Sequence, residues 1–107
     1  MGYIKHHAII ITTWDDKTLA KIYKHLVPIF GKRISKIIKS DINGFVSLFI
    51  APDGSKEDWP ESDKGDKDRA KLIRYLNTFA YEDGSNAIKY VEISYDEERE
   101  AQIVNNN

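Results

Sequence analysis

The sequence of 107 residues predicts one α+β domain whose elements follow the order β-α-β-β-α-β. Two segments repeat apolar residues at the three- and four-residue spacing of an amphipathic helix, and four shorter segments have the apolar pattern of strands. Asn43-Gly44 is the strongest short signal for a β-hairpin turn. A composition of 41% hydrophobic and 31% charged residues suits a folded globular domain with one core.

The first half of the chain predicts a strand, a helix and a hairpin. A strand is expected over residues 3–13, and Thr13-Trp14-Asp15-Asp16 matches the capping-box pattern that opens a helix. This helix is expected to end near Pro28 and Gly31, and its apolar stripe comprises Leu19, Ile22, Tyr23, Leu26 and Phe30. Residues 34–42 and 45–51 predict the two strands of the hairpin.

The second half predicts a long loop, a helix, a strand and a tail. Residues 52–67 show no apolar periodicity, and seven acids lie between Asp53 and Asp68, so a long exposed loop is expected over 52–67. A helix is predicted from about Asp66 to Tyr81, and its buried stripe comprises Leu72, Ile73, Leu76, Phe79 and Ala80. Residues 87–95 predict a fourth strand, and the polar tail 96–107 is expected to fray.

Two right-handed crossovers and one hairpin, with both helices on one face, give a four-stranded antiparallel sheet in the order 4-1-3-2, the ferredoxin-like architecture. If Ile42 pairs with Phe45, one sheet face carries Ile34, Ile38, Ile42, Phe45 and Phe49, and the opposite face carries Ile37, Val46, Leu48 and Ile50. Both faces are therefore apolar. We expect the face without helices to be covered by a second copy, by the tail or by a ligand, and homodimerisation is the commonest of these solutions.

The net charge of −1 conceals a segregation of charge along the chain. Residues 1–40 sum to +6 and residues 41–107 to −7. The basic part predicts a side that binds a phosphate-rich ligand, RNA or a nucleotide, through Lys17, Lys21, Lys24, His25, Lys32, Arg33, Lys36 and Lys39. The alternative interpretation is a solvated helix face beside an edge strand that its charges protect from aggregation.

The segment Asn43-Gly44-Phe45-Val46-Ser47-Leu48-Phe49, within this order of elements, resembles an RNA recognition motif. The resemblance covers most of the chain in topology, and it implies that exposed aromatics of the sheet stack on bases. Asn43 stands where that family carries a basic residue, and the first strand offers Ile10 and Ile11 in place of an aromatic.

Three carboxylates are expected at one end of the sheet. Asp15 and Asp16 follow the first strand, and Asp41 lies in the hairpin. Their positions resemble those of the metal-binding acids of polymerase palms and nucleotide cyclases, which implies metal-dependent phosphoryl transfer. Helix capping and turn chemistry explain the same residues without a metal.

A tryptophan in an acidic loop predicts an anchor for a protein partner, because Trp is enriched at interface hot spots. The expected partner-binding residues are Asp58, Trp59, Phe45 and Phe49. His6 and His7 are neighbours on a strand and point to opposite faces, so they do not share a metal.

The chain has no cysteine, which excludes disulfides, thiolate metal sites and a cysteine nucleophile. No run of about 20 apolar residues predicts a membrane span, and a cytoplasmic location is expected. The sequence assigns no catalytic residue, metal or cofactor. It favours a small non-enzymatic binding or regulatory domain that acts through protein–protein contacts as a homodimer. The alternatives are the phosphate-rich ligand on the basic side and the metal-dependent enzyme.

Overall fold

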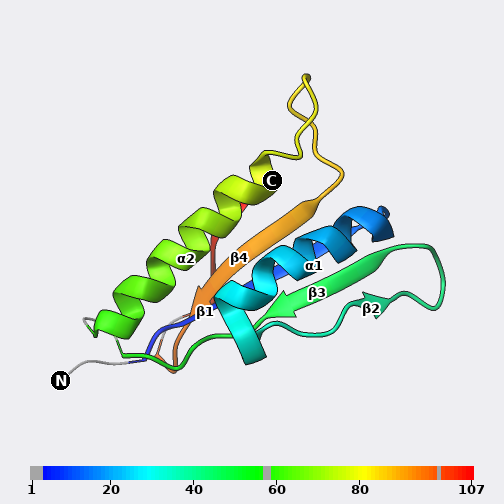
Figure 1. Cartoon of the computed structure of the whole chain (residues 1–107). Coiled ribbons are helices and arrows are strands. Elements are labelled where there is room, and N and C mark those ends of the chain that lie inside the picture. The colour runs from blue at the N-terminus through cyan, green and yellow to red at the C-terminus, as the bar shows by residue number, and fades with distance from the viewer. Residues whose placement is uncertain (1–3, 57–58, 99) are drawn as a thin grey trace.

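The computed structural model describes residues 4–56, 59–98 and 100–107, and it shows an α+β fold with two helices on one antiparallel sheet (Figure 1). The elements in chain order are β1 (His6–Thr13), α1 (Asp16–Phe30), the short 3₁₀ helix η1 (Gly31–Arg33), β2 (Ile38–Lys39), β3 (Val46–Ile50), α2 (Pro60–Asn77), β4 (Lys89–Tyr95) and β5 (Gln102–Asn106).

The sheet has five strands in the order β2-β3-β1-β4-β5, so the prediction of a four-stranded sheet in the order 4-1-3-2 is wrong in the number of strands, although β1 to β4 have the neighbours that this order gives them. The difference lies at the β4 edge. Residues expected to be a frayed tail form β5, which pairs antiparallel with β4 through Ile93–Ile103 and Val91–Asn106. Every residue of β5 is exposed, so its sequence has no buried alternation to reveal a strand.

Asparagine side chains help to attach this last strand. The Asn107 Oδ1 accepts a hydrogen bond from the backbone N–H of Tyr90 at 3.0 Å, and the Asn107 Nδ2 donates to the carbonyl of Ile88 at 2.7 Å. Hydrogen bonds of the backbone and of the Asn107 side-chain amide therefore take the place of apolar packing at this edge.

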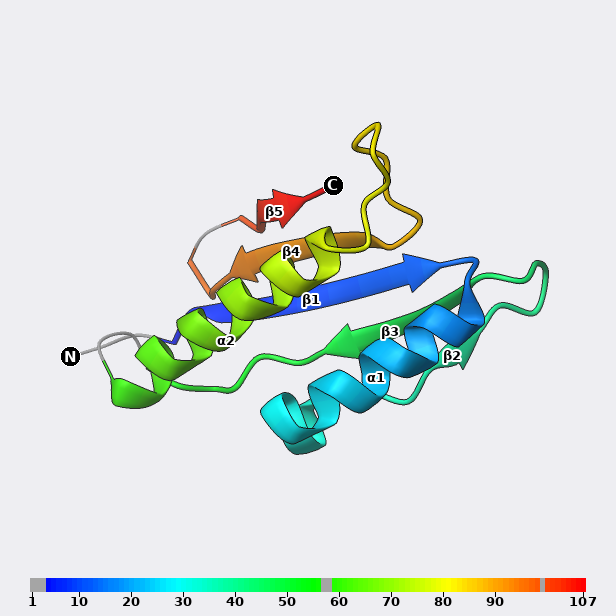
Figure 2. The ribbon, with the colours of Figure 1, turned by 45° about the horizontal axis from the view of Figure 1, so that its top comes forward.

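The hydrophobic core lies between the sheet and the two helices, which share one face of it (Figure 2). The odd-numbered positions of β1 and the even-numbered positions of β3 and β4 face the helices, as the register of the strands requires. The fully or nearly fully buried apolar side chains of this core include Ile9, Ile11, Leu19, Ile22, Leu26, Leu48, Ile50, Leu72, Leu76 and Ile88.

Helix α1 begins two residues later than the predicted capping box implies, because Asp15 is its N-cap. The Asp15 carboxylate accepts hydrogen bonds from the backbone N–H of Thr18 at 3.1 Å and from the Thr18 hydroxyl at 2.7 Å. Thr13 supports the cap, since its hydroxyl oxygen accepts from the N–H of Asp15 at 3.1 Å. At the other end, Gly31 adopts φ +57° and its N–H donates to the carbonyl of Val27.

Helix α2 begins at Pro60, so the second half of the predicted loop 52–67 is helical. Proline suits the first helical position, and Glu61 and Asp63 lie in the first turn, where carboxylates are favourable. The first three turns bury Ser62, Gly65, Asp68 and Arg69 in place of apolar residues, so the sequence shows no helical periodicity there. The helix ends at Asn77 and does not reach Tyr81.

The hairpin turn is longer than the predicted two residues. Lys39 stands opposite Val46, and the N–H of Ser40 donates to the carbonyl of Phe45 at 3.0 Å, so the turn spans residues 41–44. Asn43 closes it by accepting from the N–H of Phe45 at 2.9 Å, and Ile42 at the tip is 94% exposed. The assumed pairing of Ile42 with Phe45 is therefore wrong.

The predicted division of residues between the two sheet faces holds only in part. Val46, Leu48 and Ile50 are buried under the helices, and Ile37 packs against them from the side. Ile34 differs from the prediction, because it bridges to Ile50 and also packs against the core. In the part of the chain that the structure describes, no helix is both long and apolar enough to cross a membrane.

Candidate functional site

The sheet face opposite the helices is apolar and exposed to solvent, and we call it the helix-free face. The exposed fractions of its side chains are 65% for Ile103, 62% for Ile38, 40% for Ile10 and 39% for Phe49. The strand register places on it His6, Ala8, Ile10 and Thr12 of β1, Ile38 of β2, Ser47 and Phe49 of β3, Lys89, Val91, Ile93 and Tyr95 of β4, and Ile103 and Asn106 of β5. Lys89 is the one Lys, Arg, Asp or Glu among these thirteen.

Two hydroxyl side chains on this face form a hydrogen bond with each other. The hydroxyls of Thr12 and Ser47 hydrogen-bond across β1 and β3 at 2.9 Å. Beside them, a shallow hollow of about 270 Å³ includes Ile10, Lys89, Val91 and Asn106 in its lining. The surface is thus a flat apolar area with a shallow depression, a shape suited to contact with another protein surface.

A second group of polar side chains lies on the helix-facing side of the sheet, where β1, β4, β5 and α2 meet around the carboxylate of Glu92. Glu92 of β4 is 5% exposed, and its Oε2 lies 3.5 Å from the Nε of Arg69 on α2. Its Oε1 accepts a hydrogen bond from the Nδ2 of Asn105 on β5 at 2.8 Å. Arg69 also pairs with Asp66, and His7 of β1 places its Nδ1 3.9 Å from the Glu92 carboxylate. We call these five residues the Glu92 cluster.

The charges of the Glu92 cluster act on His7. Burial lowers the pKa of His7, and the nearby Arg69 charge, helped by Lys5, lowers it further, whereas the carboxylates of Glu92 and Asp66 raise it by less. The imidazole is therefore neutral at neutral pH. Its Nδ1 is buried and has no hydrogen-bond partner among the described residues. The Glu92 carboxylate thus joins β4 to α2 through Arg69 and to β5 through Asn105, and the neutral His7 of β1 lies beside them.

This cluster was not predicted from the sequence, in which His7 stands out only as half of an adjacent histidine pair and neither Arg69 nor Glu92 belongs to a motif. A signal was present, because Glu92 occupies a helix-facing position in the alternation of strand β4. A carboxylate at a buried strand position requires a cation or donors nearby.

Because Gly65 of α2 has no side chain, the charged groups of Asp53 and Arg69 lie close to its backbone. A Cβ at this position would lie 2.6 Å from the Oδ2 of Asp53 and 3.1 Å from the Nη1 of Arg69. Burial alone would raise the pKa of Asp53, but hydrogen bonds from Ser55 and the charges of Arg33 and Arg69 outweigh it and lower that pKa. Asp53 is therefore a carboxylate stabilised chiefly by Ser55, whose backbone N–H and hydroxyl donate to its Oδ1 at 2.9 and 2.7 Å.

Trp59, the predicted partner anchor, is the N-cap residue of α2 and is 45% exposed. The Lys56 ammonium lies 5.6 Å from the centroid of its ring, a cation–π contact. Next to it is a hollow of about 320 Å³ that includes Arg33, Asp53, Glu61, Lys64 and Asp68 in its lining. These charges are mixed and indicate no single ligand class. Asp58, the neighbouring expected contact, lies outside the described residues.

The other two expected partner-binding residues lie elsewhere. Phe49 stands opposite Ile10 on the helix-free face, and Phe45 precedes β3 and is also exposed. The structure thus separates the predicted contact residues into two regions, with the phenylalanines toward the helix-free face and Trp59 at the start of α2.

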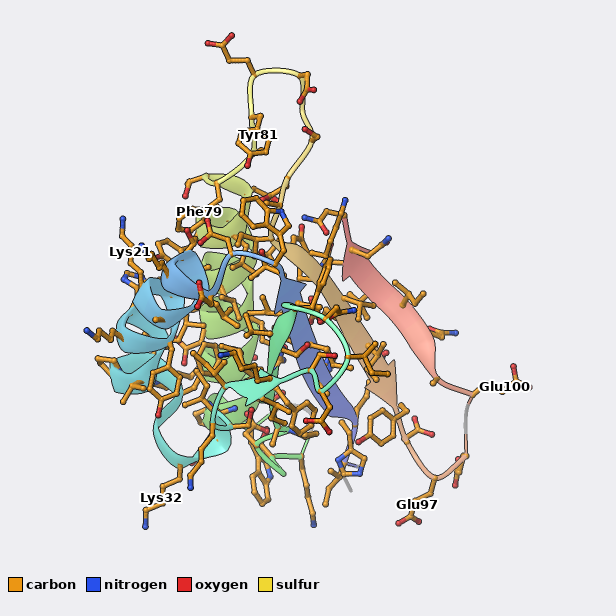
Figure 3. The ribbon with its side chains drawn as sticks, turned by 90° about the vertical axis from the view of Figure 1, so that its right-hand side faces the viewer. Lys21, Lys32, Phe79, Tyr81, Glu97 and Glu100 are labelled. Carbon is orange, nitrogen blue, oxygen red and sulfur yellow. The ribbon has the colours of Figure 1, made fainter. Side chains whose placement is uncertain are left out.

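The predicted basic residues gather on the α1 side of the molecule. Figure 3 shows Lys21 and Lys32 on that side and Glu97 and Glu100 on the opposite side, so the charge segregation of the sequence is also a segregation in space. Lys17, Lys24 and Lys36 are exposed as well, and Lys39 lies on the edge strand β2. Two of the predicted basic residues pack on aromatic rings of the same chain. The His25 ring stacks on the Tyr75 ring with 4.0 Å between the centroids, and the Arg33 guanidinium lies 5.3 Å from the centroid of the Phe30 ring.

The three predicted carboxylates have local structural roles or are exposed. Hydrogen bonds from the Thr18 hydroxyl and N–H lower the pKa of Asp15, which caps α1. Asp16 lies in the first turn of α1, and Asp41 lies in the exposed hairpin turn. Among the described residues, no three His, Cys, Asp or Glu side chains are arranged to hold a metal ion.

Comparison of the chain with models of known families, with curated proteins and with solved structures gave no match. The fold class and the surfaces described above are thus the basis for a functional interpretation. They define an α+β domain with one exposed apolar sheet face and a buried charged cluster beneath the opposite one.

Proposed function

We propose that this chain is a small protein-binding domain that acts through its helix-free face, and that the molecule docked there is a second copy of the chain. The observation that supports the proposal is the composition of that face. Seven of its thirteen strand residues are large aliphatic, Phe or Tyr side chains that are exposed or only partly buried, and Lys89 is the one Lys, Arg, Asp or Glu among them. Monomeric proteins rarely leave a contiguous apolar surface of this extent in water.

The size of the face suits a dimer interface. The five strands contain 27 residues, which at about 3.3 Å per residue and about 4.8 Å between strands give a flat area of about 430 Å². Side chains that project from the sheet present more accessible surface than this flat area. A standard interface takes about 800 Å² of accessible surface from each partner, which is of the same order.

The near absence of charge favours a second copy over a different protein. In a two-fold dimer the same patch meets itself, so a patch with many like charges would repel its own copy. An apolar face with a single lysine avoids this repulsion. Two twisted sheets pack face to face at about 10 Å with their strands roughly aligned, as in a β-sandwich.

The test is the molar mass in solution of the chain and of two isoleucine variants, measured by size-exclusion chromatography with light scattering at micromolar concentration. The unaltered chain is expected at twice its mass of 12.3 kDa. Ile10→Lys places a charge at the centre of the helix-free face and is expected to be monomeric, because burying an unpaired ammonium is costly. Ile42→Lys is the matched control at the exposed hairpin tip, and it is expected to remain dimeric.

Two results would overturn the proposal. One is an unaltered chain that is monomeric at these concentrations. The other is an Ile10→Lys variant that stays folded and still dimerises as well as Ile42→Lys does.

A further inference from the structure

The two helices carry matching rows of exposed basic side chains. The row on α1 is Lys17, Lys21 and Lys24, and the row on α2 is Lys67, Lys71 and Arg74. Both rows have the spacing i, i+4, i+7, which places the three side chains along one side of a helix. None of the six forms an ion pair with another of the described residues. The α2 row lies in the half of the chain that sums to −7, so the total charge of that half conceals it.

A contact between the helices places the two rows on one surface. The rings of His25 on α1 and Tyr75 on α2 stack with 4.0 Å between their centroids. Each row begins eight residues before its stacked ring and ends at the residue immediately before it. The helices cover the same face of the sheet and run in opposite directions (Figure 1 and Figure 2), so the rows extend from the stack in opposite directions. At about 1.5 Å per residue, the cations span about 24 Å of the outer helix surface.

Few carboxylates oppose the charge of these rows. Helix α1 has no acid after Asp16, and α2 has none after Asp68. Asp68 is itself paired with Lys64, and Asp66 is paired with Arg69. The remaining acids of α2 lie in its first turn. The outer surface of the helix pair is therefore basic, although the whole chain has a net charge of −1.

We infer that this helix surface binds the phosphate backbone of double-stranded nucleic acid without reading its sequence. Lysine and arginine neutralise phosphates, and the release of condensed counterions supplies much of the free energy of binding. A span of about 24 Å corresponds to about seven base pairs at about 3.4 Å each. The inference does not depend on the proposed homodimer, because the helices lie on the other side of the sheet from the helix-free face.

The side chains of this surface favour a duplex over other polyanions. Single-strand binding stacks bases on free aromatic rings, whereas His25 and Tyr75 stack on each other. Helices that lie on anionic membranes insert large apolar side chains, but the apolar faces of α1 and α2 pack on the sheet, and Val27 is the one large apolar side chain of the two helices that is exposed. Lysine is depleted in protein–protein interfaces and is frequent at phosphate contacts.

The test is the binding of two fluorescein-labelled duplexes of mixed sequence and about 20 base pairs, one of DNA and one of RNA, measured by fluorescence anisotropy between about 50 and 200 mM salt. The unaltered chain is expected to bind with a micromolar dissociation constant at the lowest salt. Six phosphate contacts give an expected slope of about −5 for log K against log salt concentration on DNA. Binding of either duplex supports the inference, and the difference in affinity identifies the preferred one.

Two double variants that remove the same charge separate the helix surface from the rest of the basic side. Lys21→Gln with Lys71→Gln removes one cation from each row. It is expected to weaken binding about tenfold at the lowest salt and to make the slope shallower by about two. Lys36→Gln with Lys39→Gln removes two exposed cations at and before β2, and it is expected to change the affinity less than about twofold. Thermal unfolding of both double variants checks that they are folded.

Three results would overturn the inference. The first is that neither duplex binds at the lowest salt. The second is an equal loss of affinity in the two double variants, which would assign binding to net charge and not to the helix surface. The third is binding of the chain to vesicles of phosphatidylserine and phosphatidylcholine, but to neither duplex, that is lost in Lys21→Gln with Lys71→Gln. The homodimer is judged separately, because this double variant is expected to keep the molar mass of the unaltered chain in light scattering.

Discussion

Replacing Glu92 by glutamine tests whether the Glu92 cluster holds the strands and α2 together. Glutamine has nearly the same shape and keeps an oxygen that accepts from Asn105, so the substitution removes little except the negative charge. Arg69, whose side chain is 8% exposed, then loses the carboxylate 3.5 Å from its Nε and keeps Asp66 as its remaining ion-pair partner.

The expected loss follows from the burial of both charges. Breaking a buried ion pair by removing one partner costs about 3–5 kcal/mol, because the other charge stays buried. Asp66 still pairs with Arg69, so the lower end applies, and we expect the free energy of unfolding to fall by about 3 kcal/mol. For a domain of this size, that loss lowers the melting temperature by about 12 °C.

The assay is urea and thermal unfolding followed by circular dichroism, and the control is a surface ion pair. Lys64 is 72% exposed and lies 2.8 Å from Asp68, so Lys64→Gln is expected to cost about 0.5 kcal/mol at most. In Glu92→Gln combined with Arg69→Met, the loss is expected to be smaller than the sum of the two single losses. A loss below about 1 kcal/mol for Glu92→Gln would refute the reasoning.

Three further predictions concern pH, packing and the close approach at α2. The pKa of His7 is lower in the folded state than in the unfolded chain, so its contribution to stability is complete above the unfolded value of about 6.5 and is lost as pH falls from there through the lower folded value. His7→Gln is therefore expected to flatten the dependence of unfolding on pH between about 7 and 5, and an unchanged slope would contradict this. Leu26→Ala, at a fully buried position, is expected to cost about 2–5 kcal/mol in urea unfolding, whereas Val27→Ala, which is 37% exposed, is expected to cost far less. Gly65→Ala usually raises the free energy of unfolding by about 1 kcal/mol when the glycine lies within a helix. Here no increase is expected, because the new Cβ displaces the Asp53 carboxylate; a measured increase would show that this carboxylate moves away at no cost.

The apolar core could be predicted from the sequence, because its periodicity is intact. Leu19, Ile22 and Leu26 recur on one face of α1 and are all fully buried. Helix α1 and strands β1, β3 and β4 are therefore present close to the expected positions, whereas β2 is reduced to Ile38–Lys39 and α2 begins earlier than expected. The antiparallel pairing of β1 with β3 and β4 follows from that order.

The parts that could not be predicted carry no apolar pattern. The start of α2 buries Gly65, Asp68 and Arg69, which are typical of a loop when only the sequence is considered. Strand β5 buries none of its side chains, and it is attached by backbone pairing and asparagine amides. In both segments the tertiary contacts determine the structure, and local propensity does not reveal it.

The candidate sites, like the fold, could be predicted from the sequence only in part. The exposed phenylalanine on β3 follows from strand alternation, and the structure places it on the helix-free face. The Glu92 cluster joins residues from four elements, and one sequence without an alignment does not show that His7, Arg69 and Glu92 meet. The long acidic loop expected around Trp59 is largely the first turns of α2.

The most direct test of the central claim is a residue-by-residue map of what changes when the chain is diluted. Amide spectra of the uniformly nitrogen-15-labelled chain, recorded from high to low micromolar concentration, report dissociation at each position. If two copies meet on the helix-free face, concentration-dependent shifts are expected at Ile10, Phe49 and Val91 on that face, and none at Lys21 or Lys24 on α1. Shifts confined to α1 would contradict the proposed interface, and so would unchanged spectra of a chain whose molar mass is that of a monomer.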